Sequence, residues 1–194
     1  TNSYGGQMGN FPLRGGCESF NAIMSIIYEY PNLYFTSIGP CPHIEHPRVT
    51  QYGHVGNIDF NSIIDQTHVL LIPAMRIHTI SLVKALCNGI IPLVSDGWAF
   101  DEYIHHMDNG IVVRGQWGRT SWKNEDDIFV ENYEATADPS MVHSIVRELK
   151  FLLIHPDLIE GFSKDCLKYA HDNFNIDKRN KILEDIVEKH VAQS

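Results

Sequence analysis

Apolar residues follow two different spacings along this chain. Short, nearly continuous apolar runs at 33–38, 68–72 and 90–95 alternate with segments in which apolar residues recur at every third or fourth position. The first spacing is typical of buried strands, and the second is typical of amphipathic helices. Strands that are apolar throughout and separated by helices predict a parallel sheet covered on both faces, which is an α/β fold.

The alternation predicts a definite order of elements up to residue 113. Gly39-Pro40 and Gly89 mark ends of elements, and Pro92 must lie in the first residues of its strand or on a sheet edge. The predicted strands are Leu33–Ile38, Tyr52–Val55, His68–Ile72, Ile90–Ser95 and Ile111–Val113. The predicted helices are Cys17–Tyr30, Asp59–Gln66, Ile77–Asn88 and Ala99–Met107.

Beyond residue 113 the pattern changes twice. Residues 116–138 hold six acidic residues and two tryptophans without a clear period, which predicts an irregular excursion. Three helices are predicted after it, over Ser140–Ile154, Asp157–Asn173 and Asp177–His190. One face of the last helix carries an apolar stripe that is expected to be buried, made of Ile182, Leu183, Ile186 and Val187. We therefore expect a single domain over residues 1–194 that ends in a helical tail.

The composition narrows the class of protein. The chain has 194 residues, a formal net charge of −9 and a sequence pI near 5.6, so no nucleic-acid partner is expected, because such a partner needs a basic surface. No apolar run approaches the roughly 20 residues of a membrane-spanning helix. Four widely spaced cysteines predict reduced thiols and a cytoplasmic protein.

Histidines are numerous, and they raise the question of a metal site. The chain has eleven of them, including the close pairs His43 with His46 and His105 with His106. A zinc site needs a third and a fourth ligand at a recognisable spacing, and neither pair is followed by one. We therefore expect no metal.

Candidate chemistry lies at the turns that lead from strands into helices. In an open parallel α/β sheet, ligands bind in the crevice beyond the carboxyl ends of the strands. Arg14-Gly15-Gly16 leads into the first helix, where free backbone amides and an Arg side chain suit phosphate oxygens. A flexible turn with a solvated Arg is an equally open interpretation of these three residues.

Two further turns carry polar groups. The turn after the strand 68–72 holds Arg76 and His78, followed by Thr79, Ile80 and Ser81 at a helix start, where Thr and Ser are natural caps and free amides favour an anion. The turn after the strand 90–95 holds Gly97, with Glu102 about one turn further on, and these could hold sugar hydroxyls. Alone, the second turn is equally consistent with an ordinary turn and a surface Glu.

Residues 68–113 carry a resemblance to a known family. They read HVLLIPAMRIHTISLVKALCNGIIPLVSDGWAFDEYIHHMDNGIVV and include Lys84-Ala85-Leu86, Pro92-Leu93-Val94 and Asn109-Gly110 in the family's order. This stretch resembles the nucleotide-sugar-binding, C-terminal half of GT-B glycosyltransferases, most closely the retaining glycosyltransferase family 4, also called glycosyl transferases group 1. The resemblance extends upstream to Leu13-Arg14-Gly15-Gly16 and downstream into the helical tail, and it omits the excursion at 116–138.

The resemblance implies a fold and a site. It implies one Rossmann-like GT-B half-domain, with Arg14, Gly15, His78, Thr79, Ile80, Ser81 and Gly97 toward the donor diphosphate. Leu33–Pro40 (LYFTSIGP) and Tyr52-Gly53-His54-Val55 look like the family's segments beside the base, which places Gly39, His54 and Val55 there. Roles in catalysis fall to Arg76, Lys84 and Glu102. The implied donor is a nucleotide-diphosphate sugar, used without a metal or another cofactor.

The resemblance also implies partners beyond this chain. The chain begins at Thr1 rather than Met, so we expect a piece of a longer protein whose N-terminal acceptor-binding domain is absent here. The implied activity is glycosyl transfer to a glycan, a lipid or another acceptor, as in polysaccharide biosynthesis. The implied location is cytoplasmic, with attachment to a membrane periphery through the missing domain left open.

Two positions depart from the family pattern. Lys84 stands where the family has its second Glu, which holds the ribose, and Arg76 stands where it has the first. The two lie about two helical turns apart, so both can face the same crevice edge. The departures leave three alternatives open: an active donor domain with an atypical donor, a degenerate non-catalytic binding domain, and a nucleotide-sugar epimerase. An epimerase would need cleft carboxylates, for which only Glu102 and Asp96 are candidates.

Overall fold

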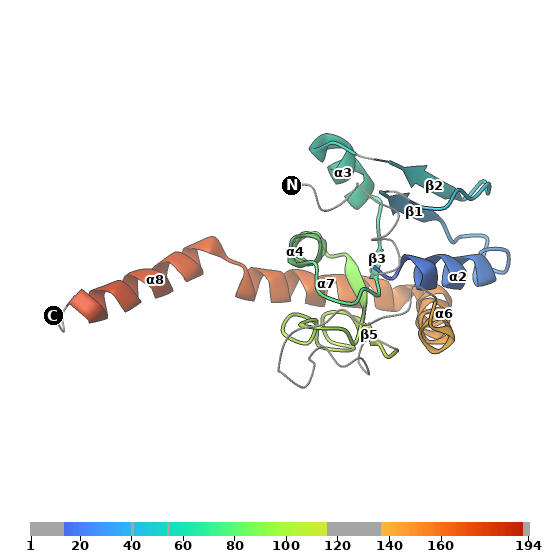
Figure 1. The fold of residues 1–194 in the computed structure, drawn as a ribbon. Coiled ribbons are helices and arrows are strands. Elements are labelled where there is room, and N and C mark those ends of the chain that lie inside the picture. Colours follow the sequence, from blue (N-terminus) through green and yellow to red (C-terminus); the bar gives the residue numbers. More distant parts are fainter. Residues whose placement is uncertain (1–13, 40, 54, 116–136, 192–194) are drawn as a thin grey trace, which may run out of the picture.

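The computed structural model describes residues 14–39, 41–53, 55–115 and 137–191. Its strands are all parallel and form two sheets, β1 (Phe35–Ile38) with β2 (Val49–Tyr52), and β3 (Val69–Ile72), β4 (Ile91–Ser95) and β5 (Ile111–Val113) in that spatial order. The helices are α2 (Gly16–Ile26), α3 (Asn57–Ile64), α4 (Thr79–Cys87), α6 (Pro139–Ile154), α7 (Pro156–Asn173) and α8 (Ile176–Val191) (Figure 1). The predicted α/β class is confirmed.

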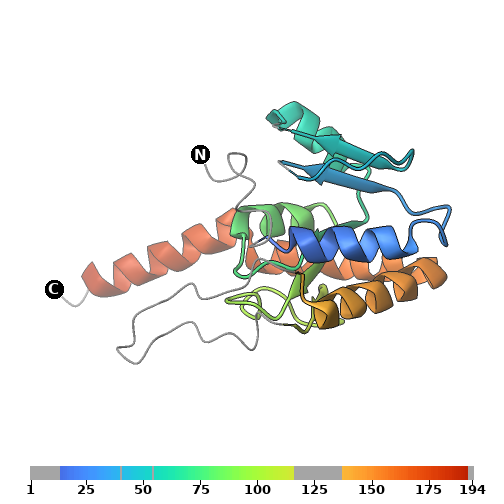
Figure 2. The same cartoon turned by 45° about the vertical axis from the view of Figure 1, so that its right-hand side comes forward.

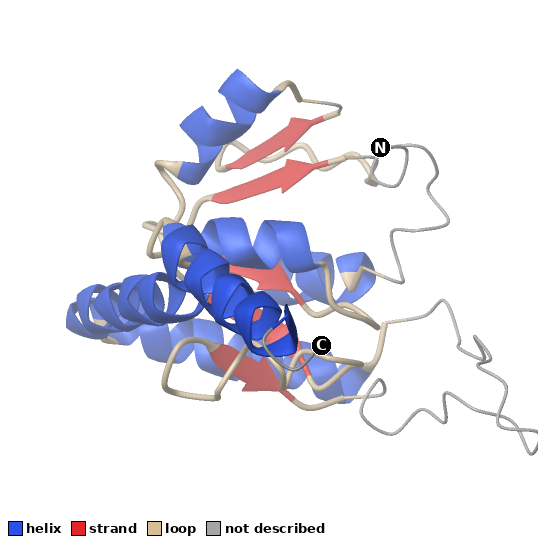
Figure 3. Ribbon diagram, turned by 90° about the vertical axis from the view of Figure 1, so that its left-hand side faces the viewer, coloured by secondary structure: helices blue, strands red, loops and turns tan. Residues whose placement is uncertain are grey.

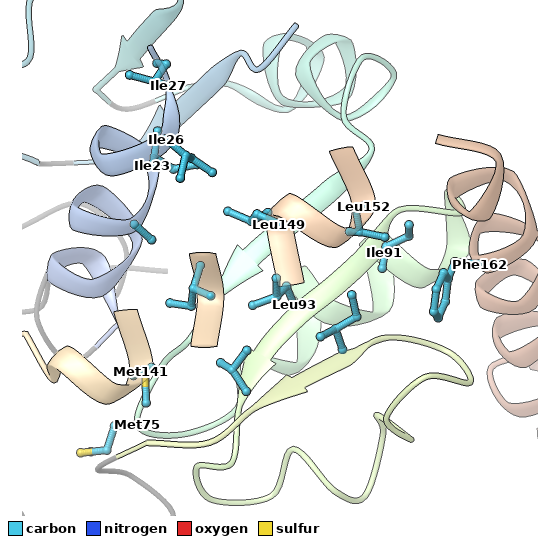
Figure 4. Packing of buried hydrophobic residues seen from close by; sticks show 14 residues of the cluster. Ile23, Ile26, Ile27, Met75, Ile91, Leu93, Met141, Leu149, Leu152 and Phe162 are labelled. Atoms are coloured by element: carbon cyan, nitrogen blue, oxygen red, sulfur yellow. The ribbon is translucent and has the colours of Figure 1, made fainter. Parts of the chain in front are cut away.

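Strand β4 forms the centre of the larger sheet, and both of its faces are covered. Ile91 and Leu93 belong to an apolar cluster shared with α2 and α6, and Val94 belongs to a second cluster shared with α4 and α7. Figure 4 shows the first cluster, with side chains from α2 and α6 meeting those of β4. Every residue of β4 is buried, which explains why its sequence shows no polar alternation. Pro92 is the second residue of β4, at the strand start where its missing N–H is tolerated.

The second strand lies three residues earlier than predicted. The strand predicted over Tyr52–Val55 is observed over Val49–Tyr52, where half-buried and exposed residues alternate. Its register pairs Phe35 with Val49 and Ile38 with Tyr52, so the ladder stops where β1 stops. Val55 lies after the strand, in the connection to α3. The prediction was wrong because the start of β2 is set by its pairing with β1, which the local pattern does not show.

The helix predicted over Ala99–Met107 is wrong. This segment forms consecutive turns, in which Ile104 N donates to Phe100 O at 2.8 Å. Ala99 and Met107 both have left-handed backbones, with φ of 66° and 65°, which an α-helix excludes. The buried side chain of Asn109 forms hydrogen bonds with the backbone of this segment, accepting from His105 N at 2.7 Å and donating to Tyr103 O at 2.8 Å.

The apolar stripe of α8 is exposed, which contradicts its predicted burial. Ile182, Leu183, Ile186 and Val187 are each roughly half exposed, and α8 buries none of its residues. Figures 1 and 2 show why, because α8 extends away from the sheets beyond the end of α7. Among the described residues, no helix has the length and apolar character needed to span a membrane.

Arg48 joins the smaller sheet to α2. Its guanidinium donates to the carbonyl oxygens of Ile27 and Tyr30 at 2.5 Å each and lies 3.4 Å from that of Leu33. Ile27 is the C-cap of α2, whose carbonyl has no intrahelical donor, and Tyr30 and Leu33 lie in the turn that follows the helix. We expect Arg48→Met to lower the free energy of unfolding by about 2–3 kcal/mol, the scale of lost charge-assisted hydrogen bonds in a half-buried site.

Denaturant unfolding of both proteins measures this change, and Arg179→Met on the exposed face of α8 is the matched control. The control is expected to stay within about 0.5 kcal/mol of wild type. A loss of the same size in both variants would show that Arg48 has no special role in holding β2 on α2.

Candidate functional site

The described strands of both sheets point the same way, so their carboxyl ends share one edge of the molecule (Figure 3). The turn before α2 reaches this edge. Gly15 is the N-cap of α2 with φ 70°, and a Cβ added to it would lie 2.6 Å from the Pro73 ring, even closer to the Pro73 carbonyl. Only glycine fits this approach, which brings Arg14 against the turn between β3 and α4.

The turn after β4 closes on the same place. Trp98 N donates to Met75 O at 3.0 Å, and Ile77 N donates to Trp98 O at 3.1 Å, which pairs Trp98 with Arg76. Ser95 is fully buried, and its Oγ donates to Ala74 O and accepts from Gly97 N. The three turns singled out in the sequence therefore meet, joined by backbone contacts.

Two arginines, Arg14 and Arg76, lie where the turns meet. Burial lowers the pKa of Arg14, and the charge of nearby Arg76 lowers it further. Arg14 is half-buried and Arg76 is exposed. Two guanidinium groups at one junction of turns favour the binding of an anion there. Diphosphate oxygens fit such a pair well, because guanidinium groups bind phosphate in a bidentate manner.

His78 caps α4, a role that the sequence had suggested for Thr79 and Ser81. His78 is the N-cap residue, and its Nδ1 accepts from Ser81 N at 3.4 Å and lies 3.0 Å from Ser81 Oγ. Thr79 and Ile80 form the first turn of α4 and are exposed. An accepting Nδ1 requires the neutral ring with its proton on Nε2, and burial lowers the pKa of His78 in agreement with this.

The His78 cap predicts a pH dependence of stability. Because the folded state holds the pKa of His78 below its ordinary value of 6.5, the unfolded chain takes up the proton first as the pH falls. The capping contribution is thus complete above about pH 6.5 and is lost as the pH falls through the lowered pKa.

We expect the free energy of unfolding to fall more between pH 8 and pH 5.5 in wild type than in His78→Asn, because Asn caps a helix but does not titrate. Denaturant unfolding at both pH values measures the difference. Parallel curves for the two proteins would show that His78 titrates alike in the folded and unfolded states.

The other residues with suggested catalytic roles lie on other segments, outside the three turns. Lys84 lies in the last turn of α4, exposed, with Nζ 4.9 Å from the centre of the Phe60 ring on α3. Glu102 is exposed in the irregular segment after β4. Arg76 and Lys84 therefore have different surroundings, the former beside Trp98 and the latter beside α3.

The residues suggested for the base lie at the end of the smaller sheet. Gly39 lines a cavity of about 230 Å³ together with Cys41, His43, Gln51, Tyr52 and Gly53. Among the lining residues, Gln51 is held by its side chain, whose Nε2 donates to Pro42 O at 2.7 Å and lies 3.1 Å from Cys41 Sγ. Val55 is half-buried before α3, and His54 lies outside the described residues.

Two carboxylates near the junction hold the chain on either side of residues 116–136. Asp96 Oδ1 accepts from Gly115 N at 3.0 Å, and the buried Glu18 accepts from Asp138 N at 3.2 Å. The Asp96 carboxylate thus binds a backbone amide, a role that the sequence did not indicate. In the part of the chain that the structure describes, no group of three or more His, Cys, Asp or Glu residues converges in a way that could hold a metal ion.

Comparison with known proteins identifies the class of fold. No family model matches the chain, and no curated protein matches it. The C-terminal domain of a glycosyl transferase group 1 family protein from Francisella tularensis matches with a TM-score of 0.63 and 12% identity, over 84% of this chain and 81% of that chain. Sucrose-phosphate synthase from Thermosynechococcus elongatus matches with a TM-score of 0.64 and 14% identity, over 93% of this chain and 43% of that chain.

A further match is the catalytic domain of starch synthase IV from Arabidopsis thaliana bound to ADP and acarbose, with a TM-score of 0.55 and 16% identity, over 93% of this chain and 36% of that chain. All three structures are GT-B glycosyltransferases. The chain therefore has the fold of a GT-B half-domain, a Rossmann-like parallel sheet with a helical tail, as its sequence predicted. It spans less than half the length of the two synthases.

Proposed function

We propose that this chain is a donor-binding domain that holds a nucleotide-diphosphate sugar for glycosyl transfer. The observation that carries the proposal is the close approach of Gly15 to Pro73, which brings Arg14 to the turn that holds Arg76 at the carboxyl edge of a GT-B fold. The first turn of α4 lies beside them and adds helix N-terminal amides that favour an anion. The cavity beside Gly39 is the proposed place of the base.

Catalysis in this proposal is electrostatic. As the sugar leaves, negative charge grows on the diphosphate, and Arg14, Arg76 and the amides of α4 stabilise it. The chain's own cations supply this stabilisation, so the proposed reaction needs no metal. Glu102 is proposed to bind sugar hydroxyls, and Lys84 to donate to the ribose from its place beside Phe60.

A second domain is proposed to bind the acceptor. The chain spans 43% and 36% of the two synthases that share its fold. Its helix α8 presents an apolar stripe, centred on Leu183 and Ile186, that nothing in the described residues covers. We propose the remainder of a longer chain as the partner that completes the cleft.

Calorimetric titration with UDP, GDP and ADP tests the proposal. We expect one of them to bind, and Arg14→Gln to weaken that binding by about 1–3 kcal/mol, the scale of a charge-assisted hydrogen bond to phosphate. Arg179→Gln on α8 is the control and is expected to bind as wild type does. Equal affinities for wild type and Arg14→Gln would contradict the proposed diphosphate site.

A degenerate, non-catalytic binding domain is the second candidate. The observation in its favour is that two cations replace the acidic pair of the resembled family, and that one of them, Lys84, lies over Phe60. The charge-reversal experiment described in the Discussion separates this candidate from an active donor domain.

A further inference from the structure

Trp98 is a large aromatic residue that the fold holds half exposed at the junction of the three turns. Trp98 is 52% exposed, although its backbone N and O are both engaged by the turn between β3 and α4. Its bridge partner is Arg76, one of the two cations proposed to hold the diphosphate. The position of Trp98 beside that site is therefore set by the backbone.

The residues on either side of Trp98 fix its position beside Arg76. A Cβ on Gly97 would lie 2.7 Å from Ala74 O and closer still to Met75 O, so a larger residue has no room. Ala99 has a left-handed backbone with φ 66°, a conformation that non-glycine residues avoid. Phe100 is buried and anchors the chain immediately afterwards. Residues in such sparsely populated backbone conformations cluster at active sites and ligand-binding turns.

We propose that Trp98 stacks against the sugar ring of the bound donor and selects sugars with an uninterrupted C–H face. The inference rests on the proposed function and adds to it the residue that recognises the transferred sugar. An indole ring offers a broad apolar face to the C–H groups of a pyranose, while the sugar hydroxyls stay free for Glu102 and water.

The order of the strands assigns Trp98 to the sugar instead of the base. The cavity beside Gly39 follows β1, in the smaller sheet, and the Arg14–Arg76 pair lies between the starts of α2 and α4. Arg76 follows β3, and Trp98 follows β4, the next strand in the spatial order β3-β4-β5. An extended nucleotide-diphosphate sugar with its base near Gly39 and its phosphates at the arginines places its sugar near Trp98.

The test compares affinities for each nucleoside diphosphate and its sugar derivative, using UDP with UDP-glucose, GDP with GDP-mannose and ADP with ADP-glucose on the 194-residue chain. We expect wild type to bind one sugar derivative more tightly than the matching diphosphate. Trp98→Ala should lose this sugar-dependent gain by tenfold or more, while its affinity for the diphosphate alone stays within about twofold. Trp98→Phe should keep most of the gain, and Tyr28→Ala, which removes another highly exposed aromatic residue, should keep all of it.

A fluorescence measurement gives a second readout. Trp117→Phe with Trp122→Phe leaves Trp98 as the remaining tryptophan, whose emission should change with the sugar derivative and stay unchanged with the diphosphate. If Trp98→Ala weakens both ligands equally, or neither, the stacking inference is overturned while the proposed diphosphate site stands. If wild type binds none of the six ligands, the proposed function fails, and the inference that rests on it fails with it.

Discussion

Gly15→Ala is expected to lower the free energy of unfolding by about 3 kcal/mol and to remove nucleoside-diphosphate binding. A left-handed backbone costs alanine about 1–2 kcal/mol, and the added methyl group overlaps Pro73, which costs about 1–3 kcal/mol more. The turn then has to move away from the start of α4, and Arg14 moves with it. Denaturant unfolding and titration with the diphosphate that wild type binds measure the two effects.

Gly161→Ala is the matched control, because Gly161 lies inside α7 and an added Cβ meets no atom within 4 Å. This variant is expected to gain about 0.5–1 kcal/mol, since alanine favours a helix more than glycine does. If Gly15→Ala has the same free energy of unfolding as wild type, the turn moves away from Pro73 without a measurable loss of stability. Normal binding by a destabilised Gly15→Ala would separate the turn from the proposed site.

Replacing Arg76 and Lys84 with Glu is expected to weaken diphosphate binding more than a hundredfold, or about 3 kcal/mol. The double substitution changes the net charge by about four units and restores the acidic pair of the resembled family. Because Arg76 acts on Arg14 while Lys84 contacts Phe60, we expect Arg76→Glu alone to cause most of the loss. Calorimetry on the two single variants and the double variant measures how the loss is divided.

The affinity of the double variant also decides between an active donor-binding domain and a degenerate, non-catalytic one. A double variant that binds a common UDP- or GDP-sugar more tightly than wild type would identify the cations as the cause of a lost donor site, and so favour the degenerate domain. Loss of binding in a variant that unfolds like wild type would favour an active domain adapted to strongly anionic donors, such as a sugar that carries a carboxylate.

The fold class was predictable because its signals are local. The apolar runs that became β3 and β4 contain no polar alternation, and the helices α6 and α7 have long, regular apolar periods. The Gly-containing turns before α2 and after β4 were visible for the same reason, since glycine marks where backbone segments approach closely.

The wrong predictions share a different cause. Phe100 and Ile104 are four residues apart and both buried, which resembles a helical period, yet they belong to a chain of turns held by Asn109. The stripe of α8 has a clear helical period, and the helix is present, but periodicity does not tell whether a partner covers that face.

The sequence by itself determined the alternation of strands and helices, the parallel α/β class and the three turns with candidate chemistry. Tertiary structure alone decided that these turns meet, that the charge of Arg76 acts on Arg14, that His78 caps α4 and that Trp98 is presented beside Arg76. The physical reason is that periodicity and turn residues act over a few neighbouring positions. The site, in contrast, depends on distances between segments that lie far apart in the chain and are set by the packing of α2, β3 and β4.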